Sequence, residues 1–171
     1  MNPAVWGFIG VLLGSIIGAS ASILTSIINT RNESKLQSKR ERYQREERLK
    51  EFQRRNLLRL QDLLPHCMFL MNRAHIVDVN NAKNQKKWRE VLLSADLDGK
   101  IRISFRKLTI IIDRVSNEKL RKDLMVTHKY MGDYLFAKSE IEAECLLKKY
   151  TNNFSRLMAK VGIELRSTYN V

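Results

Sequence analysis

Cysteine and proline are scarce in this chain, with two of each among 171 residues, and glycine occurs seven times. Such low proline and glycine contents argue against a disordered or low-complexity protein, and the length predicts one domain of ordinary size. Cys67 and Cys145 are isolated, without a Cys-x-x-Cys pair or a cysteine-rich frame. We therefore expect two reduced thiols in an intracellular helical domain and no disulfide.

The common signatures of enzymes and metal sites are also missing. The sequence has no GxxxxGK, GxGxxG, GxSxG or HExxH pattern, and its three histidines are scattered. Residues 96–100, "DLDGK", share the start of a calcium loop but lack its third acidic position and its closing glutamate. Turn residues that stop a helix are a simpler explanation. We expect no catalytic residue, no cofactor and no metal ion.

Charged side chains are absent before Arg31, and residues 5–28 form an apolar run of 24 residues. At about 1.5 Å per residue this run would be roughly 36 Å long as a helix, enough to cross a hydrocarbon core of about 30 Å. Asn2 and Pro3 suit a helix N-cap and first position, and Trp6 suits a membrane interface. We therefore expect residues 1–30 to form a transmembrane segment.

A cleavable signal peptide is the alternative for this segment, because residues 19–21, "ASA", resemble a cleavage site. It is the weaker one, since no Lys or Arg precedes the apolar run and the run continues past the supposed cut. Residues 31–59 hold eleven Lys or Arg against five Asp or Glu. Because the basic side of a span stays in the cytosol, we expect a single pass of the cell (inner) membrane, with the N-terminus outside and the C-terminal domain in the cytoplasm.

Small residues recur every four positions within the apolar run. In lipid, such a stripe lets helices approach closely, so it predicts a glycine zipper that pairs the helix with another copy or with another membrane protein. Glycine is common in transmembrane helices in any case, which is the plainer explanation. The expected packing residues are Gly10, Gly14, Gly18, Ser22 and Ser26.

The next segment, residues 31–64, is strongly basic and contains neither Gly nor Pro, so we expect the helix to continue through it. The whole chain has a formal net charge of +13, which favours an anionic neighbour. Beside a span, cations attract anionic lipid by about 1 kcal/mol each. Nucleic acid is the other partner considered, although no nucleic-acid-binding signature follows. The residues expected to contact anionic lipid are Arg31, Lys35, Lys39, Arg40, Arg42 and Arg45.

Residues 65–171 have apolar positions at helical intervals and predict a small antiparallel helical bundle in the cytosol. We expect a break at Pro65, a short helix up to a polar loop at 80–84, and a second helix over 85–97 that stops near Gly99. Residues 100–115 fit a strand or a helix, and we favour a helix because no partner strand exists.

Two further helices are expected near the C-terminus. The first is capped by Ser116 or Asn117, and the second begins with a capping box of Ser139 and Glu142. Their apolar stripes complete the predicted core, which comprises Leu120, Leu124, His128, Met131, Leu135, Ile141, Cys145, Tyr150, Phe154, Leu157, Val161 and Leu165.

The sequence as a whole predicts an all-α chain: a transmembrane helix that continues into a basic stalk, followed by the bundle. This layout favours a non-enzymatic membrane-anchored protein that oligomerises through its span and presents its bundle to an unidentified cytosolic protein. One alternative is a pore-forming or membrane-disrupting effector, such as a toxin or an antiviral defence component, with Ser15, Ser22 and Ser26 toward a lumen. Another is a membrane tether for nucleic acid, attached through the basic segment.

Overall fold

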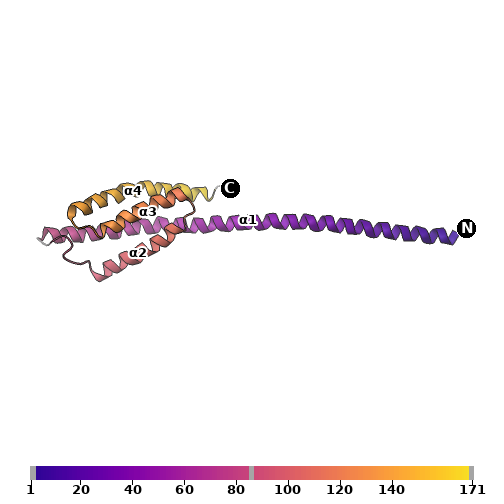
Figure 1. Ribbon diagram of the computed structural model, residues 1–171, viewed down its shortest axis with the longest axis horizontal. Helices are drawn as coiled ribbons and strands as arrows, with labels where there is room; N and C mark the ends of the chain where they lie inside the picture. The colour runs from indigo at the N-terminus through magenta and orange to yellow at the C-terminus, as the bar shows by residue number, and fades with distance from the viewer. Residues whose placement is uncertain (1–2, 85–86, 170–171) are drawn as a thin grey trace. The chain divides into compact units, whose positions relative to one another are not determined.

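The computed structural model describes residues 3–84 and 87–169, with side chains from Gly7 on except at positions 8, 9, 12, 13 and 16. Over these residues the only regular elements are four helices: α1 (Pro3–Lys83), α2 (Ala95–Asp113), α3 (Glu118–Tyr134) and α4 (Glu140–Ser167) (Figure 1). The predicted all-α class is confirmed. Helix α1 begins at Pro3 as expected, whereas Asn2 and the side chain of Trp6 lie outside the described residues.

Within the part of the chain that the structure describes, no helix combines the length and the apolar character that a membrane crossing requires. The structure therefore does not support the predicted transmembrane helix at the N-terminus.

The chain divides into two compact units, Met1–Arg48 and Leu49–Val171. The first unit contains the N-terminal part of α1, and its described side chains are exposed throughout. The second contains the rest of α1 together with α2, α3 and α4. The boundary falls at Leu49, where the charged pattern of the sequence changes to apolar residues at helical spacing.

In the second unit, α3 and α4 lie side by side (Figure 1). Helix α2 packs against α1 through Leu97 and Ile101, and it also contacts α3, where the ring of Phe105 lies 5.0 Å from that of His128. Successive helices run in opposite directions, so the predicted antiparallel helical bundle is present. The largest fully buried side chains are those of Tyr134 and Tyr150, whose rings meet edge to face at a centroid distance of 6.1 Å. The α1 residues buried around them are Leu57, Leu60, Leu64, Cys67, Met68 and Met71.

The predicted break at Pro65 is wrong, because α1 continues through this residue to Lys83. The separate short helix and the loop at 80–84 are thereby corrected as well, except that Asn84 lies beyond the helix. Proline inside a helix removes one N–H donor and costs about 3 kcal/mol. The buried neighbours Leu64 and Cys67 offset that cost, since this turn of α1 packs into the core.

The predicted helix over 85–97 is wrong for residues 87–94, because α2 begins only at Ala95. The hydroxyl of Ser94 caps it by accepting the N–H of Leu97 at 3.3 Å. Asp96 and Asp98 lie in the first turn, where carboxylates complement the positive end of the helix dipole. The residues that were expected to stop one helix therefore start another.

The other helix boundaries agree with the sequence. Residues 100–113 are helical, as favoured over a strand. The side chain of Asn117 accepts the N–H of Leu120 at 3.1 Å, and that of Ser139 accepts the N–H of Glu142 at 3.2 Å. In a complete capping box the carboxylate of Glu142 would accept the backbone N–H of Ser139. Here it accepts the N–H of Lys138, one residue earlier, at 2.8 Å.

Two residues of α4 that were expected in the core are exposed. The exposed fraction of Ile141 is 83 %, and the thiol of Cys145 is also exposed. The buried face of α4 is set by Ala143, Tyr150 and Leu157, which follow one another at intervals of seven residues. Ile141 and Cys145 each lie two positions from Ala143, about 200° around the helix, and therefore point away from the core.

Candidate interaction surfaces

The five predicted packing residues lie along α1 in the first unit, and all are exposed. A methyl group added at Gly10, Gly14 or Gly18 would meet no atom within 4 Å. Ser22 and Ser26 continue the row at the same spacing. The row is thus an uncovered ridge of small residues, and its role in pairing stays a prediction.

Large aliphatic side chains surround this ridge and are exposed as well. The exposed fraction is 72 % for Val11 and 61 % for Leu24. The nearby hydroxyls of Thr25 and Thr30 donate to the backbone carbonyls of Ala21 and Ser26, at 2.8 and 2.9 Å. These two hydroxyls are satisfied within the helix, so the surface is more apolar than its composition suggests.

Three of the six predicted lipid-contacting cations are brought together on the basic segment of α1. Lys35, Lys39 and Arg42 line a shallow pocket with Ser34 and Ser38. Their spacing of three to four residues places the three cations on one face of the helix. Of the other three, Arg31 and Arg40 are exposed on α1, and Arg45 pairs with Glu41 at 3.6 Å.

A groove between α1 and α2, which we call the α1–α2 groove, was not expected from the sequence. It has a volume of about 420 Å³, an apolar floor and a charged rim. The one sequence feature that could have indicated it is the face of α2 on which apolar and basic residues alternate at helical spacing. The groove is lined by Arg59, Asp62 and Leu63 of α1 and by Lys107, Ile110, Ile111 and Arg114 of α2.

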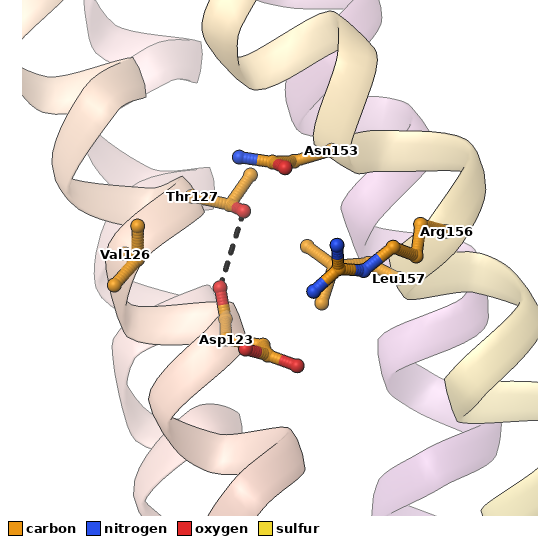
Figure 2. A pocket seen from close by; sticks show the side chains of 6 residues that line it. All are labelled: Asp123, Val126, Thr127, Asn153, Arg156 and Leu157. Carbon is orange, nitrogen blue, oxygen red and sulfur yellow. Dashed lines mark hydrogen bonds between the residues drawn. The ribbon is translucent and has the colours of Figure 1, made fainter.

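A smaller polar pocket of about 160 Å³ lies between α3 and α4 (Figure 2). Thr127 donates its hydroxyl to the backbone carbonyl of Asp123 at 3.1 Å, and Arg156 extends across from α4. The carboxylate of Asp123 pairs with Lys160, and this hydrogen bond lowers its pKa. The carboxylate is therefore neutralised by a lysine of the neighbouring helix, which suits a contact between helices better than a reaction.

A buried polar cluster connects the segment before α2 to the bundle. Trp88 donates its indole N–H to the carbonyl of Ala137 at 3.2 Å. Arg89 lies beside Asp78, and its guanidinium is 4.9 Å from the ring centroid of Tyr134. Burial raises the pKa of Tyr134 to about 12, so its hydroxyl stays protonated at neutral pH. These contacts hold the segment before α2 against the bundle and shield the residues from solvent.

The described residues offer little for catalysis or metal binding. Among them, no three His, Cys, Asp or Glu side chains lie close enough together to hold a metal ion. Burial raises the pKa of the Cys67 thiol to about 12, so this thiol is not a nucleophile near neutral pH. Burial also lowers the pKa of His128, which lies against the ring of Phe105. The surfaces described above are therefore the stronger candidates for function.

Comparison with family models, with curated proteins and with solved structures gave no match.

Proposed function

We propose that this chain is a non-enzymatic, membrane-anchored interaction protein: residues 1–30 insert into the bilayer, and the helical bundle presents a surface to a cytosolic protein. The observation that carries the proposal is the uncharged run before Arg31, whose described aliphatic side chains are exposed on α1. Exposed apolar surface costs about 25 cal/mol per Å² in water, so a surface of this kind favours an apolar environment. The ridge of small residues supports pairing of two such helices within lipid.

The basic segment supports both the attachment of the chain to the membrane and its orientation across it. Lys35, Lys39 and Arg42 share one face, which suits the phosphates of anionic headgroups. Residues 31–59, which follow the apolar run, hold eleven cations and none precedes the run, which favours a cytoplasmic bundle. The six predicted cations then contact anionic headgroups at the inner leaflet of the cell membrane.

An anchor accounts for the apolar run better than a conducting pore. A pore requires polar side chains toward water, whereas Thr25 and Thr30 direct their hydroxyls to their own helix. The basic segment carries only Tyr43 and Phe52 as aromatics among residues 31–59, so it offers few platforms for stacked bases. These observations favour the anchor over the effector and over the nucleic-acid tether.

Extraction of membranes with alkaline carbonate tests the anchor. The full chain should remain in the pellet, and an Ile17→Lys, Leu24→Lys variant should move to the supernatant, because each lysine costs about 2.5–3.5 kcal/mol at the centre of a membrane helix. Leu36→Lys, outside the apolar run, is the matched control and should stay in the pellet. Complete extraction of the unchanged chain would overturn the proposal.

A potential-sensitive dye distinguishes the anchor from the effector. Cells that express the full chain, or its Gly14→Leu, Gly18→Leu variant, should keep the same membrane potential as cells without it. Depolarisation by the unchanged chain alone would favour the pore, with the glycine ridge as its assembly face. For pairing itself, cross-linking in native membranes should give dimers of the unchanged chain and fewer of the variant.

A further inference from the structure

We infer that the α1–α2 groove binds an acidic amphipathic helix of a protein partner. The inference deepens the proposed function, on which it rests, by naming the surface of the bundle that is presented and the chemistry of what binds there.

The floor of the groove can hold apolar side chains. Leu63 is partly buried and Ile111 almost fully buried, whereas the exposed fraction of Ile110 is 43 %. Ile103 lies two turns before Ile110 on the same face of α2, and its exposed fraction is 58 %. Apolar contacts spaced along a helix in this way fit a second helix whose apolar residues recur every three to four positions.

The rim of the groove is positively charged. Arg59, Lys107 and Arg114 line the groove together with one carboxylate, that of Asp62, and none of these three cations forms an ion pair with a described residue. Cations earlier in α2 behave differently: Lys100 pairs with Asp96 at 2.7 Å, and Arg102 pairs with Asp98 at 3.1 Å. Positive charge is thus neutralised within the start of α2 and left uncompensated beside the groove, where an acidic partner would supply the counter-charges.

One end of the groove is held in place by hydrogen bonds within the chain, without a partner bound. The side-chain amide of Gln53 donates to the carbonyl of Arg114 at 2.9 Å and accepts the N–H of Ser116 at 3.1 Å. These two bonds join the end of α2 to α1. A preformed groove loses little conformational freedom on binding, which favours affinity for a short helical ligand.

Other occupants fit less well. A second copy of this chain, joined through the same face, would bring Arg59, Lys107 and Arg114 against their own equivalents. Nucleic acid would compensate the charge but would leave Ile103 and Ile110 without apolar contacts. An acidic amphipathic helix satisfies both the rim and the floor.

The test uses the full chain in nanodiscs of neutral phosphatidylcholine and an 18-residue fluorescent peptide. The peptide carries Leu at positions i, i+3, i+4 and i+7 along one face, Glu at positions flanking that face, and Ala and Gln elsewhere so that it can form a helix. A scrambled peptide of the same composition is its control. Fluorescence anisotropy should show the ordered peptide binding at least about tenfold more tightly than the scrambled one. Equal binding of the two would overturn the inference, since net charge alone would then explain it.

Variants locate the site. Lys107→Glu with Arg114→Glu should weaken binding by about tenfold or more, and Ile110→Ser by a smaller factor. Lys129→Glu with Lys148→Glu makes the same change in net charge at exposed positions of α3 and α4 that do not line the groove, and it should leave binding within about twofold. Equal losses in the two charge variants would overturn the inference. Because Ile110 is exposed, its replacement tests the groove even if the double variant is poorly folded.

Further measurements distinguish the peptide from the other possible occupants of the groove. If the groove variant abolishes self-association, or binding to phosphatidylserine vesicles, while peptide affinity is unchanged, the groove serves a second copy or a lipid surface and the inference is wrong. Co-elution of the chain with nanodiscs reports the anchor separately. Loss of co-elution contradicts the proposed function, whereas anchored protein that does not distinguish the peptides contradicts only the groove.

Discussion

Arg89 donates from its Nε to Oδ2 of Asp78 at 3.1 Å, and the side chain of Asp78 is only 2 % exposed. The two residues are eleven positions apart, so the pair attaches the segment before α2 to the last turns of α1. Arg89 adopts a left-handed backbone conformation with φ of 58°, which costs a non-glycine residue roughly 1 kcal/mol or more. The buried ion pair therefore fixes a connection that its own backbone disfavours.

Removing Arg89 should destabilise the bundle strongly. An Arg89→Leu variant leaves the Asp78 carboxylate buried without its partner, which typically costs about 3–5 kcal/mol. The double variant Arg89→Leu, Asp78→Leu should recover much of that loss. Urea unfolding measures both, and the exposed pair of Lys100 and Asp96 provides the control, with Lys100→Leu costing less than about 1 kcal/mol. If Arg89→Leu lowers the free energy of unfolding no more than Lys100→Leu does, the pair of Arg89 and Asp78 is not important for stability.

The two cysteines should react at very different rates. Cys145 is exposed, whereas Cys67 is fully buried and burial raises its thiol pKa to about 12. Because the thiolate is the reactive form, we expect a thiol reagent at pH 8 to label one site per folded chain and two in denaturant. The Cys145→Ser variant should show almost no labelling until it unfolds. Fast labelling of that variant in its folded state would mean that Cys67 is accessible.

His128 should make the bundle less stable in mild acid. Burial is the largest cause of its lowered pKa and is partly opposed by Phe105 and Asp113, so folding favours the neutral ring. The unfolded chain then binds more protons below the ordinary pKa of 6.5, and stability falls as the pH decreases through that value. Thermal unfolding between pH 7.5 and 5.5 should show this slope, and His128→Gln should reduce it. His66→Gln, at an exposed position, is the control, and an equal reduction there would refute the assignment to His128.

The fold was predictable where local chemistry decides it. Asn117 and Ser139 accept the backbone N–H groups expected of them, and buried Leu60 and Leu124 follow helical spacing. Sequence reasoning failed where tertiary packing outweighs a local signal, as at Pro65, and where one motif has two meanings, as at Asp96 and Asp98. The packing and lipid-contact residues lie at exposed positions, but their roles depend on surroundings that the chain does not itself contain.

The α1–α2 groove was not predicted, for a different reason. Its rim combines Arg59 with Lys107 and Arg114, which are about fifty residues away along the chain. Periodicity identifies the buried face of each helix, but it does not say which two exposed faces become neighbours. Only the packing of α2 beside α1 brings an uncompensated charge and an apolar floor together.

Replacing Pro65 with alanine should stabilise the protein by roughly 1–2 kcal/mol, because α1 continues through this position. Alanine restores the missing N–H donor to the helix, although it also gives the unfolded chain more freedom, which offsets part of the gain. Urea unfolding of the full chain in detergent measures the change, and Pro3→Ala, at the first position of α1, serves as the control with little effect expected. A decrease in stability for Pro65→Ala would mean that the chain needs a break there, as its sequence first indicated.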